Sequence, residues 1–114
     1  MYQIAGEADL ALLLASPLAV LYKHSPICPT SSLARDEMVV LMGRRPVPVY
    51  LLDVVRHRLL SRTLAERLGV AHASPQAIIL RDGVGVWHRS HFDIQAEVVA
   101  RALDHLAGAT AAGD

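Results

Sequence analysis

A run of five apolar residues, Leu18 to Tyr22, constrains the fold more than any other part of the 114-residue chain. Ser16-Pro17 separates it from an apolar helical stretch, and a polar segment follows it. A continuous apolar run of this length is typical of a strand that is buried on both faces, because a half-exposed strand alternates apolar and polar residues. Such a strand needs helices on both faces of its sheet, so the run predicts an α/β fold.

Four helices are predicted from apolar spacing and from residues that start and stop helices. Pro29 fits a first helical position, Gly43 and Gly69 fit the ends of two helices, and Asp93 is a good N-cap. The helices are expected over residues 7–15, 29–42, 57–68 and about 93–106. Their core residues are expected to include Leu33, Met38, Leu41 and Met42 on the second helix and Ile94, Val98, Ala102 and Leu106 on the fourth.

Three further strands are predicted over residues 47–54, 76–81 and 84–88. Asp82-Gly83 between the last two is typical of a tight hairpin. The resulting order, α-β-α-β-α-β-β-α, predicts a mixed sheet of about four strands with helices on both faces. The chain is expected to form a single domain over residues 1–114, with a disordered tail over about 107–114.

Composition excludes several classes of protein. Acidic and basic residues balance at 11 each, which argues against a nucleic-acid or membrane-surface partner. The run Leu10 to Leu14 follows acidic residues and is cut short by Pro17, so it does not resemble a signal peptide. A single cysteine excludes a disulfide framework within the chain and fits a reducing compartment. We therefore expect a cytoplasmic protein.

Cys28 is the strongest candidate for chemistry. It lies where a strand is expected to end and a helix to begin, and Pro29 follows it. Free N–H groups and the positive end of the helix dipole stabilise a thiolate at such a position, and the thiolate is the nucleophilic form. The alternative is a small buried apolar residue. Since no second cysteine exists, a redox cycle at Cys28 must pass through a mixed disulfide with another molecule.

Six motifs, in the same order along the chain, resemble the monothiol bacilliredoxins, which are thioredoxin-fold proteins of bacteria that use bacillithiol in place of glutathione. They are Lys23-His24-Ser25, Ile27-Cys28-Pro29-Thr30-Ser31, Val47-Pro48-Val49-Tyr50, Ala65-Glu66-Arg67-Leu68-Gly69-Val70, Ser74-Pro75-Gln76 and Trp87-His88-Arg89-Ser90-His91-Phe92-Asp93-Ile94. The family motif reads Thr-Cys-Pro-Ile-Ser, so Ile27 and Thr30 depart from it.

The resemblance implies roles for particular residues. Cys28 is the implied nucleophile, within a motif that includes Pro29 and Ser31. Pro75 takes the place of the cis-proline that faces the cysteine in thioredoxin-like proteins, which would leave the backbone of Ser74 free to pair with an incoming thiol compound or peptide.

The resemblance also implies a place for the thiol's carboxylates. The corner formed by Ser90, His91 and Asp93 corresponds to the place where glutaredoxins hold a carboxylate of glutathione, and bacillithiol ends in a malate with two carboxylates. Lys23 would supply a cation, unless it is a solvated lysine at a strand end.

Three aromatic or imidazole side chains stay open in role. His24 or His88 is a candidate for proton transfer to or from the thiol, and Trp87 either walls the thiol pocket or packs in the core. No zinc-ligand spacing is present, so no metal site and no resident cofactor are expected.

The implied activity is a thiol–disulfide oxidoreductase that removes bacillithiol from protein mixed disulfides, with bacillithiol as co-substrate. Its expected partners are bacillithiolated proteins, a low-molecular-weight thiol and, for recycling, a second redoxin. Two alternatives stay open: an iron–sulfur carrier that uses Cys28 from each of two chains, and a redox-sensing binding protein without turnover.

Overall fold

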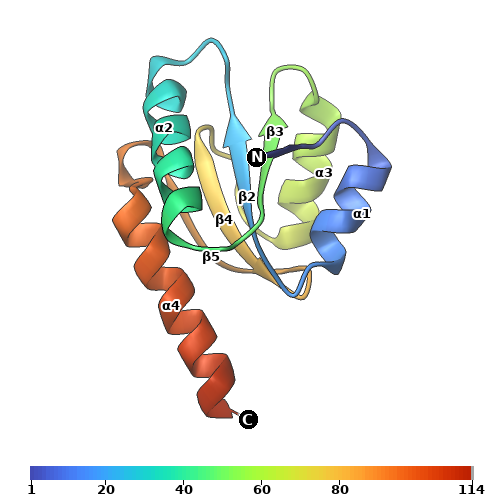
Figure 1. The fold of residues 1–114 in the computed structure, drawn as a ribbon. Helices are drawn as coiled ribbons and strands as arrows, with labels where there is room; N and C mark the ends of the chain where they lie inside the picture. The colour runs from blue at the N-terminus through green and yellow to red at the C-terminus, as the bar shows by residue number, and fades with distance from the viewer. Residues whose placement is uncertain (114) are drawn as a thin grey trace.

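The fold is a twisted five-stranded sheet covered by helices on both faces (Figure 1). The computed structural model describes the backbone of residues 1–113 and the side chains of residues 1–107. The strand order is β1-β3-β2-β4-β5; β1, β3 and β2 run parallel, and β4 and β5 are antiparallel to their neighbours. The strands are β1 (Tyr2–Gln3), β2 (Leu18–His24), β3 (Val49–Asp53), β4 (Gln76–Arg81) and β5 (Val84–Ser90).

Two helices pack on each face of the sheet. α1 (Glu7–Ala15) and α3 (Arg58–Leu68) cover one face, while α2 (Pro29–Arg44) and α4 (Ala96–Gly113) cover the other (Figure 1). A short 3-10 turn, η1 (His91–Asp93), joins β5 to α4. Among the residues that the structure describes, no helix is long and apolar enough to cross a membrane.

The strand β2 lies at the centre of the sheet and is buried on both faces, as its apolar run predicts. Val20 and Tyr22 contribute to the core beneath α2 and α4, whereas Ala19 and Leu21 contribute to the core beneath α1 and α3. All four side chains are completely buried. The mixed α/β fold class is therefore confirmed.

One strand, β1, was not predicted from the sequence. β1 adds a fifth strand at the edge of the sheet, where Tyr2 and Gln3 pair with Tyr50 and Leu51 of β3. Two residues are too few to show an alternating pattern, so the strand is visible only through its pairing partner. The strand count is five instead of about four.

The buried face of α2 differs from the one expected. Leu33 and Met42 were expected in the core, yet they are 57% and 41% exposed. The stripe that faces the sheet has a spacing of three and four residues and includes small side chains: Ser31, Ala34, Met38 and Leu41. Gly43 does not end the helix either, because α2 continues to Arg44 and Arg45 is its C-cap.

The start of the last helix was also placed wrongly. Asp93 belongs to the turn η1, and α4 begins at Ala96. The intervening turn changes the helical phase, so Val99, Ala100 and Leu103 are buried, while Val98, Ala102 and Leu106 are half-buried. The α4 backbone is helical to Gly113. The side chains of residues 108–114 and the backbone of residue 114 lie outside the described residues, so the disordered tail stays a prediction.

The hairpin between β4 and β5 gives a direct test of the fold. Asp82 and Gly83 both have positive φ, at 52° and 78°, as a tight hairpin turn requires. A Cβ atom on Gly83 would lie 2.8 Å from the carbonyl oxygen of Leu14 in α1. The hairpin tip therefore packs too closely on α1 to accept a side chain.

We predict that Gly83→Ala lowers the free energy of unfolding by about 2 kcal/mol, because it combines left-handed strain with a backbone clash. Gly43→Ala is the matched control. Gly43 lies in a helix with open space around it, so its replacement should stabilise the protein by up to about 1 kcal/mol. Urea denaturation of both variants checks the prediction, and equal free energies for both would contradict it.

Candidate functional site

Cys28 lies at the N-cap of α2, directly after the loop that leaves β2 (Figure 1). Its backbone is extended, with φ −106° and ψ 120°, and Pro29 takes the first helical position. Its N–H donates to the carbonyl of Ser25 at 3.2 Å, which closes the loop. The thiol is half-buried, so an incoming sulfur can reach it. The predicted strand-end, helix-start position of the cysteine is confirmed.

The first turn of α2 favours the charged form of this thiol. The backbone N–H of Ser31 has the largest effect and lowers the pKa of Cys28, opposed by partial desolvation. The N–H of Thr30 and the hydroxyls of Thr30 and Ser31 lower it further. The side chain of Cys28 makes no capping hydrogen bond in its neutral form. The N–H and O–H donors therefore stabilise mainly the thiolate. The first turn of α2 therefore favours the thiolate, which is the nucleophilic form of a cysteine.

A buried hydrogen-bond chain connects β2 to the first turn of α2. The Tyr22 hydroxyl donates to the carbonyl oxygen of Ser31 at 2.7 Å, and it lies 2.8 Å from Nδ1 of His24. Since the single phenolic proton goes to the carbonyl, His24 must donate through Nδ1–H, which leaves Nε2 as its proton acceptor. Burial, followed by the positive charge of Arg35, lowers the pKa of His24 and favours this neutral form.

Ser31 takes part in the site from inside the protein. It is completely buried, and its Oγ accepts the N–H of Ser25 at 3.2 Å. Together with the Tyr22 bond, this contact ties the loop before Cys28 to the helix after it. Ser31 thus supports the thiol and offers no surface to a bound molecule.

A hydrogen bond links the loop before β4 to the turn after β5. The Ser74–Pro75 peptide bond is cis, as the resemblance implied. The carbonyl of Pro75 accepts the N–H of His91 at 3.1 Å, and His91 has a positive φ of 55°. The Ser74 hydroxyl is buried and has no hydrogen-bond partner among the described residues. Ser90 pairs with Gln76 at the end of the β4–β5 ladder.

A groove of about 310 Å³ lies between the first turns of α2 and the turn η1. Thr30, next to the nucleophile, and His91 both line it, which places the predicted corner beside the start of α2. Two carboxylates, Asp36 and Glu37, also line this groove. Glu37 Oε1 accepts the N–H of Ala96 at 2.8 Å, so the protein's own carboxylate occupies the N-terminus of α4. Asp93, expected there as a cap, is exposed in η1.

Lys23 lies on the opposite face of the sheet from α2. It pairs with Leu52 and Gln76, and Leu52 packs in the core beneath α1 and α3. Lys23 is only 1% exposed, so it is not a solvated lysine. Its ammonium contacts Nδ1 of His72 at 2.6 Å. Burial lowers the pKa of Lys23 from 10.5 to about 8.

The structure separates Trp87 and His88 across the sheet. Trp87 pairs with Ile79, packs against the core beneath α2 and α4, and carries Arg89 over its ring at 4.6 Å. His88 pairs with Ile78 and is exposed on the other face, away from α2. Of the residues considered for proton transfer, His24 is the one that hydrogen bonds connect to the start of α2.

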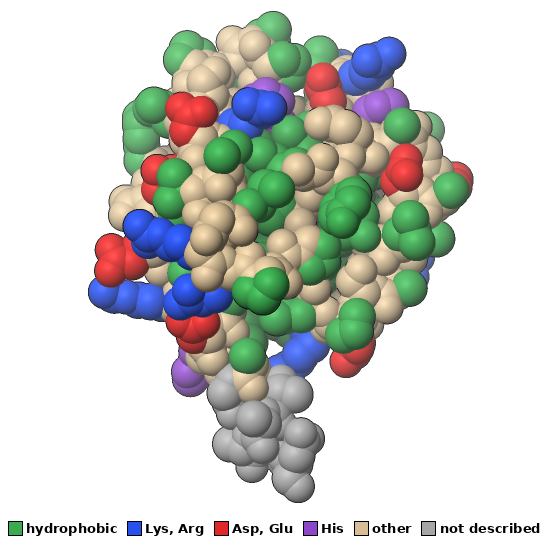
Figure 2. All heavy atoms as spheres, viewed as in Figure 1, with side chains coloured by type: hydrophobic (Ala, Val, Ile, Leu, Met, Phe, Trp, Pro, Cys, Tyr) green, Lys and Arg blue, Asp and Glu red, His purple; other side chains and the backbone are tan. Residues whose placement is uncertain are grey.

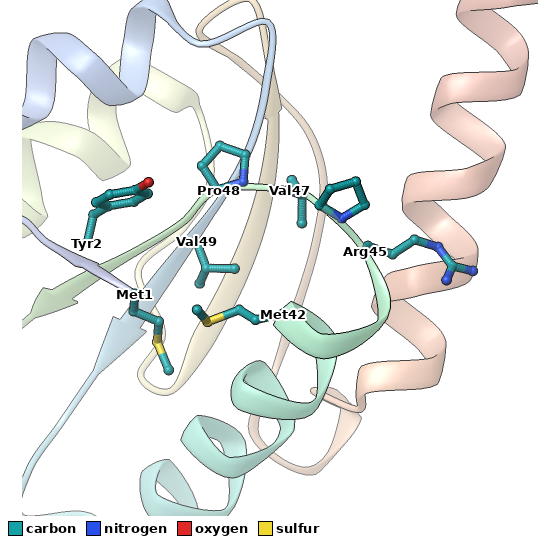
Figure 3. Close-up of a pocket in the computed structure, with 8 residues that line it drawn as sticks. Met1, Tyr2, Met42, Arg45, Val47, Pro48 and Val49 are labelled. Atoms are coloured by element: carbon teal, nitrogen blue, oxygen red, sulfur yellow. The ribbon is translucent and has the colours of Figure 1, made fainter.

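Another hollow in the described surface lies far from the thiol. Met1, Met42 and Val49 point toward one another there, between the edge strand and the C-terminal end of α2 (Figure 3). The length of α2, 16 residues or roughly 24 Å, separates that end from Cys28. Hydrophobic side chains also gather in the middle of the face in Figure 2, with charged side chains mainly around them. This hollow is not part of the thiol site.

Among the described residues, no group of three or more His, Cys, Asp or Glu side chains could hold a metal ion. The site consists of a thiol, hydrogen-bond donors and a histidine.

A mixed sheet, a helix that begins at a cysteine and a cis-proline loop beside it define a thioredoxin-like domain. Solved structures agree. A putative oxidoreductase with a thioredoxin fold matches with a TM-score of 0.83 and 30% identity, over 89% of this chain and 91% of that chain. Thioredoxin from Trypanosoma brucei brucei matches with a TM-score of 0.79 and 13% identity, over 95% and 91%. A mutant thioredoxin from Halobacterium salinarum matches with a TM-score of 0.76 and 14% identity, over 91% of this chain and 88% of that chain. Similarities at 13% and 14% identity concern the fold alone.

The family is more specific than the fold. The family model described as monothiol bacilliredoxin BrxC matches residues 4–99, which include Cys28, Pro75 and the η1 turn. The chain therefore belongs to the monothiol bacilliredoxin family, as its motifs predicted. Family and fold together support a thiol redox role.

Three residues that contact the thiol site, the start of α4 or Lys23 were not recognised in the sequence. Tyr22 was assigned to the strand alone, although a tyrosine at the end of a buried run needs a partner for its hydroxyl. His72 was assigned no role, because its contact with Lys23 spans 49 positions. Glu37 reaches Ala96 across 59 positions and shows no local signal.

We predict that the Cys28 thiol reacts as a thiolate below the usual pH range of cysteine, and that Ser31→Ala raises its pKa by removing one hydroxyl donor. Ser32→Ala is the control, since Ser32 is exposed and does not affect the thiol. The alkylation rate of Cys28 as a function of pH measures both. Identical midpoints for the two variants would show that the hydroxyl of Ser31 does not act on the thiolate.

We further predict that Lys23→Met is more stable than the natural protein at pH 7, because a buried ammonium with no anionic partner is unfavourable. The folded-state pKa is lowered, so the unfolded chain binds more protons between pH 8 and 10.5. The contribution of Lys23 to stability therefore rises with pH across that window, and the advantage of the variant shrinks.

Urea denaturation at several pH values tests this slope. Arg67→Met, which removes an exposed cation from α3, should keep the slope of the natural protein. A Lys23→Met protein with an unchanged slope would contradict the assignment.

Proposed function

We propose that this protein is a cytoplasmic thiol–disulfide oxidoreductase that removes bacillithiol from protein mixed disulfides through Cys28. The observation that carries the proposal is the thiol itself: a half-buried cysteine at the start of a helix, with its pKa lowered by the turn that follows, in a chain of the monothiol bacilliredoxin family.

The first step is a thiol–disulfide exchange. The Cys28 thiolate attacks the bacillithiol sulfur of the mixed disulfide, a new sulfur–sulfur bond forms, and the target cysteine leaves as a thiolate that takes up a proton. Electrons balance, because one disulfide is replaced by another. The target is restored and Cys28 carries the bacillithiol.

The groups around Cys28 support this step. The N–H groups of Thr30 and Ser31 stabilise the negative charge on the attacking sulfur. The proposed role of the Ser74 backbone, before the cis-proline, is to align the incoming disulfide. His24, which the Tyr22 hydroxyl connects to the start of α2, is the proposed partner for proton exchange with the thiol.

The second step needs a thiol from outside this domain. The position three residues after Cys28 holds Ser31, and the chain has one cysteine. Free bacillithiol or the cysteine of another redoxin attacks the adduct, and Cys28 leaves as a thiolate. Bacillithiol is then a co-substrate, and the protein needs no resident cofactor.

Intact-protein mass spectrometry tests the proposal directly. The reduced protein is mixed with a bacillithiolated test protein, and one bacillithiol should move from the target to Cys28. Cys28→Ser should lose this transfer completely.

The same target carrying glutathione in place of bacillithiol tests whether the exchange is selective for bacillithiol. We expect faster transfer from the bacillithiolated target. A target that keeps its bacillithiol in the presence of reduced, natural protein would refute the function.

A further inference from the structure

A second cluster of chemically active side chains lies on the face of the sheet that the thiol does not use. A cavity of about 230 Å³ opens between the first turns of α3 and the loop after β3. The residues that line it are Val54, Val55, Arg58, Ser61, Arg62 and His72.

The polar groups of this cavity belong to one network with Lys23. The Lys23 ammonium contacts His72 Nδ1 at 2.6 Å, and the Ser61 hydroxyl lies 3.4 Å from the same nitrogen. Ser61 is 2% exposed and Lys23 is 1% exposed. The network therefore extends from the surface at His72 to a buried ammonium behind it.

The charge of the cluster is positive. Burial lowers the pKa of His72, and the positive charges of Lys23 and Arg62 lower it further. Arg58 and Arg62 both line the cavity, and Lys23 lies behind His72. The cavity thus has two cations on its wall and a third one next to its imidazole.

No carboxylate of the described residues neutralises these cations. The ion pairs of the described residues join Arg45 to Asp104 and Arg101 to Glu97, and neither involves Lys23, Arg58 or Arg62. Asp53 ends β3 close by in the chain, but its Oδ1 accepts the N–H groups of Val55 and Arg56 instead. Gln76, opposite Lys23 in the sheet, donates to the carbonyl of Ala71 through Nε2, and its buried Oε1 has no hydrogen-bond partner within the described part of the chain.

We propose that this cavity is a binding site for a small oxyanion with two negative charges, held by Arg58 and Arg62 with Ser61 as hydrogen-bond donor, while the charge of Lys23 acts on it from behind His72. Phosphate and a pair of neighbouring carboxylates share this chemistry. Guanidinium groups suit both, because they offer paired donors in the geometry that such oxygens accept.

The two sides of the molecule differ in the charge that they offer to an anion. The groove beside the thiol carries the carboxylates Asp36 and Glu37, and Glu37 already occupies the N–H of Ala96. The cavity at α3 carries only cations and neutral groups on its wall. An anion therefore gains attraction at α3 and meets repulsion at η1.

Isothermal titration calorimetry with inorganic phosphate, and separately with malate, tests the site at constant ionic strength and pH 7. The natural protein should bind at least one of the two in a 1:1 ratio. Arg62→Gln should weaken binding about tenfold, because it removes a charge-assisted contact. Arg67→Gln, an exposed cation on the same helix outside the cavity, should weaken it less than about twofold.

Amide NMR spectra locate the anion. Ser61, Arg62 and His72 should shift on titration, and the shifts should disappear in Arg62→Gln. Binding of phosphate indicates a free oxyanion as the ligand, whereas binding of malate alone indicates the carboxylates of a larger molecule.

Absence of binding for both anions would overturn the proposal, and so would equal losses in the two variants or shifts confined to the first turn of α2. The titration uses no thiol exchange, so its outcome is independent of the function proposed for Cys28.

Discussion

The last residues of β2 determine where both polar clusters of this protein lie. Side chains alternate along a strand, so Tyr22 and His24 face α2 while Lys23 between them faces α3. Because β2 is paired on both sides and buried on both faces at these positions, the side chains of Tyr22 and Lys23 stay inside the protein, while His24 at the strand end is half-buried. Three consecutive residues thus supply the thiol site on one face and the cationic cavity on the other.

The two clusters satisfy their buried groups in different ways. Tyr22 keeps its proton, since burial raises its pKa, and donates to the Ser31 carbonyl of the helix that carries the nucleophile. Among the described residues, the partner of the Lys23 ammonium is the neutral imidazole of His72, which leaves its charge uncompensated when it is protonated. The first arrangement stabilises a fixed geometry, and the second leaves a place for a negative charge from outside.

The sequence predicted the elements with local signals and missed the contacts that cross the fold. The run Leu18 to Tyr22, the N-cap Cys28 and the Asp82-Gly83 hairpin each follow from neighbouring residues, and all are confirmed. Lys23 was expected beside the thiol because five positions separate it from Cys28, but strand alternation directs it to the other face. The burial of Ser31 and the capping of Ala96 by Glu37 depend on tertiary packing, which apolar counting does not reveal.

Ser31 lies three positions after Cys28, where a second cysteine could release an adduct from the first. A neighbouring thiol would release an adduct at a rate fixed by the protein, but Ser31 is a hydroxyl sealed in the core. In the exchange proposed for Cys28, release is therefore second order, and the lifetime of the adduct varies inversely with the concentration of the thiol that removes it. The fraction of Cys28 that carries an adduct then falls as the concentration of the surrounding thiol rises.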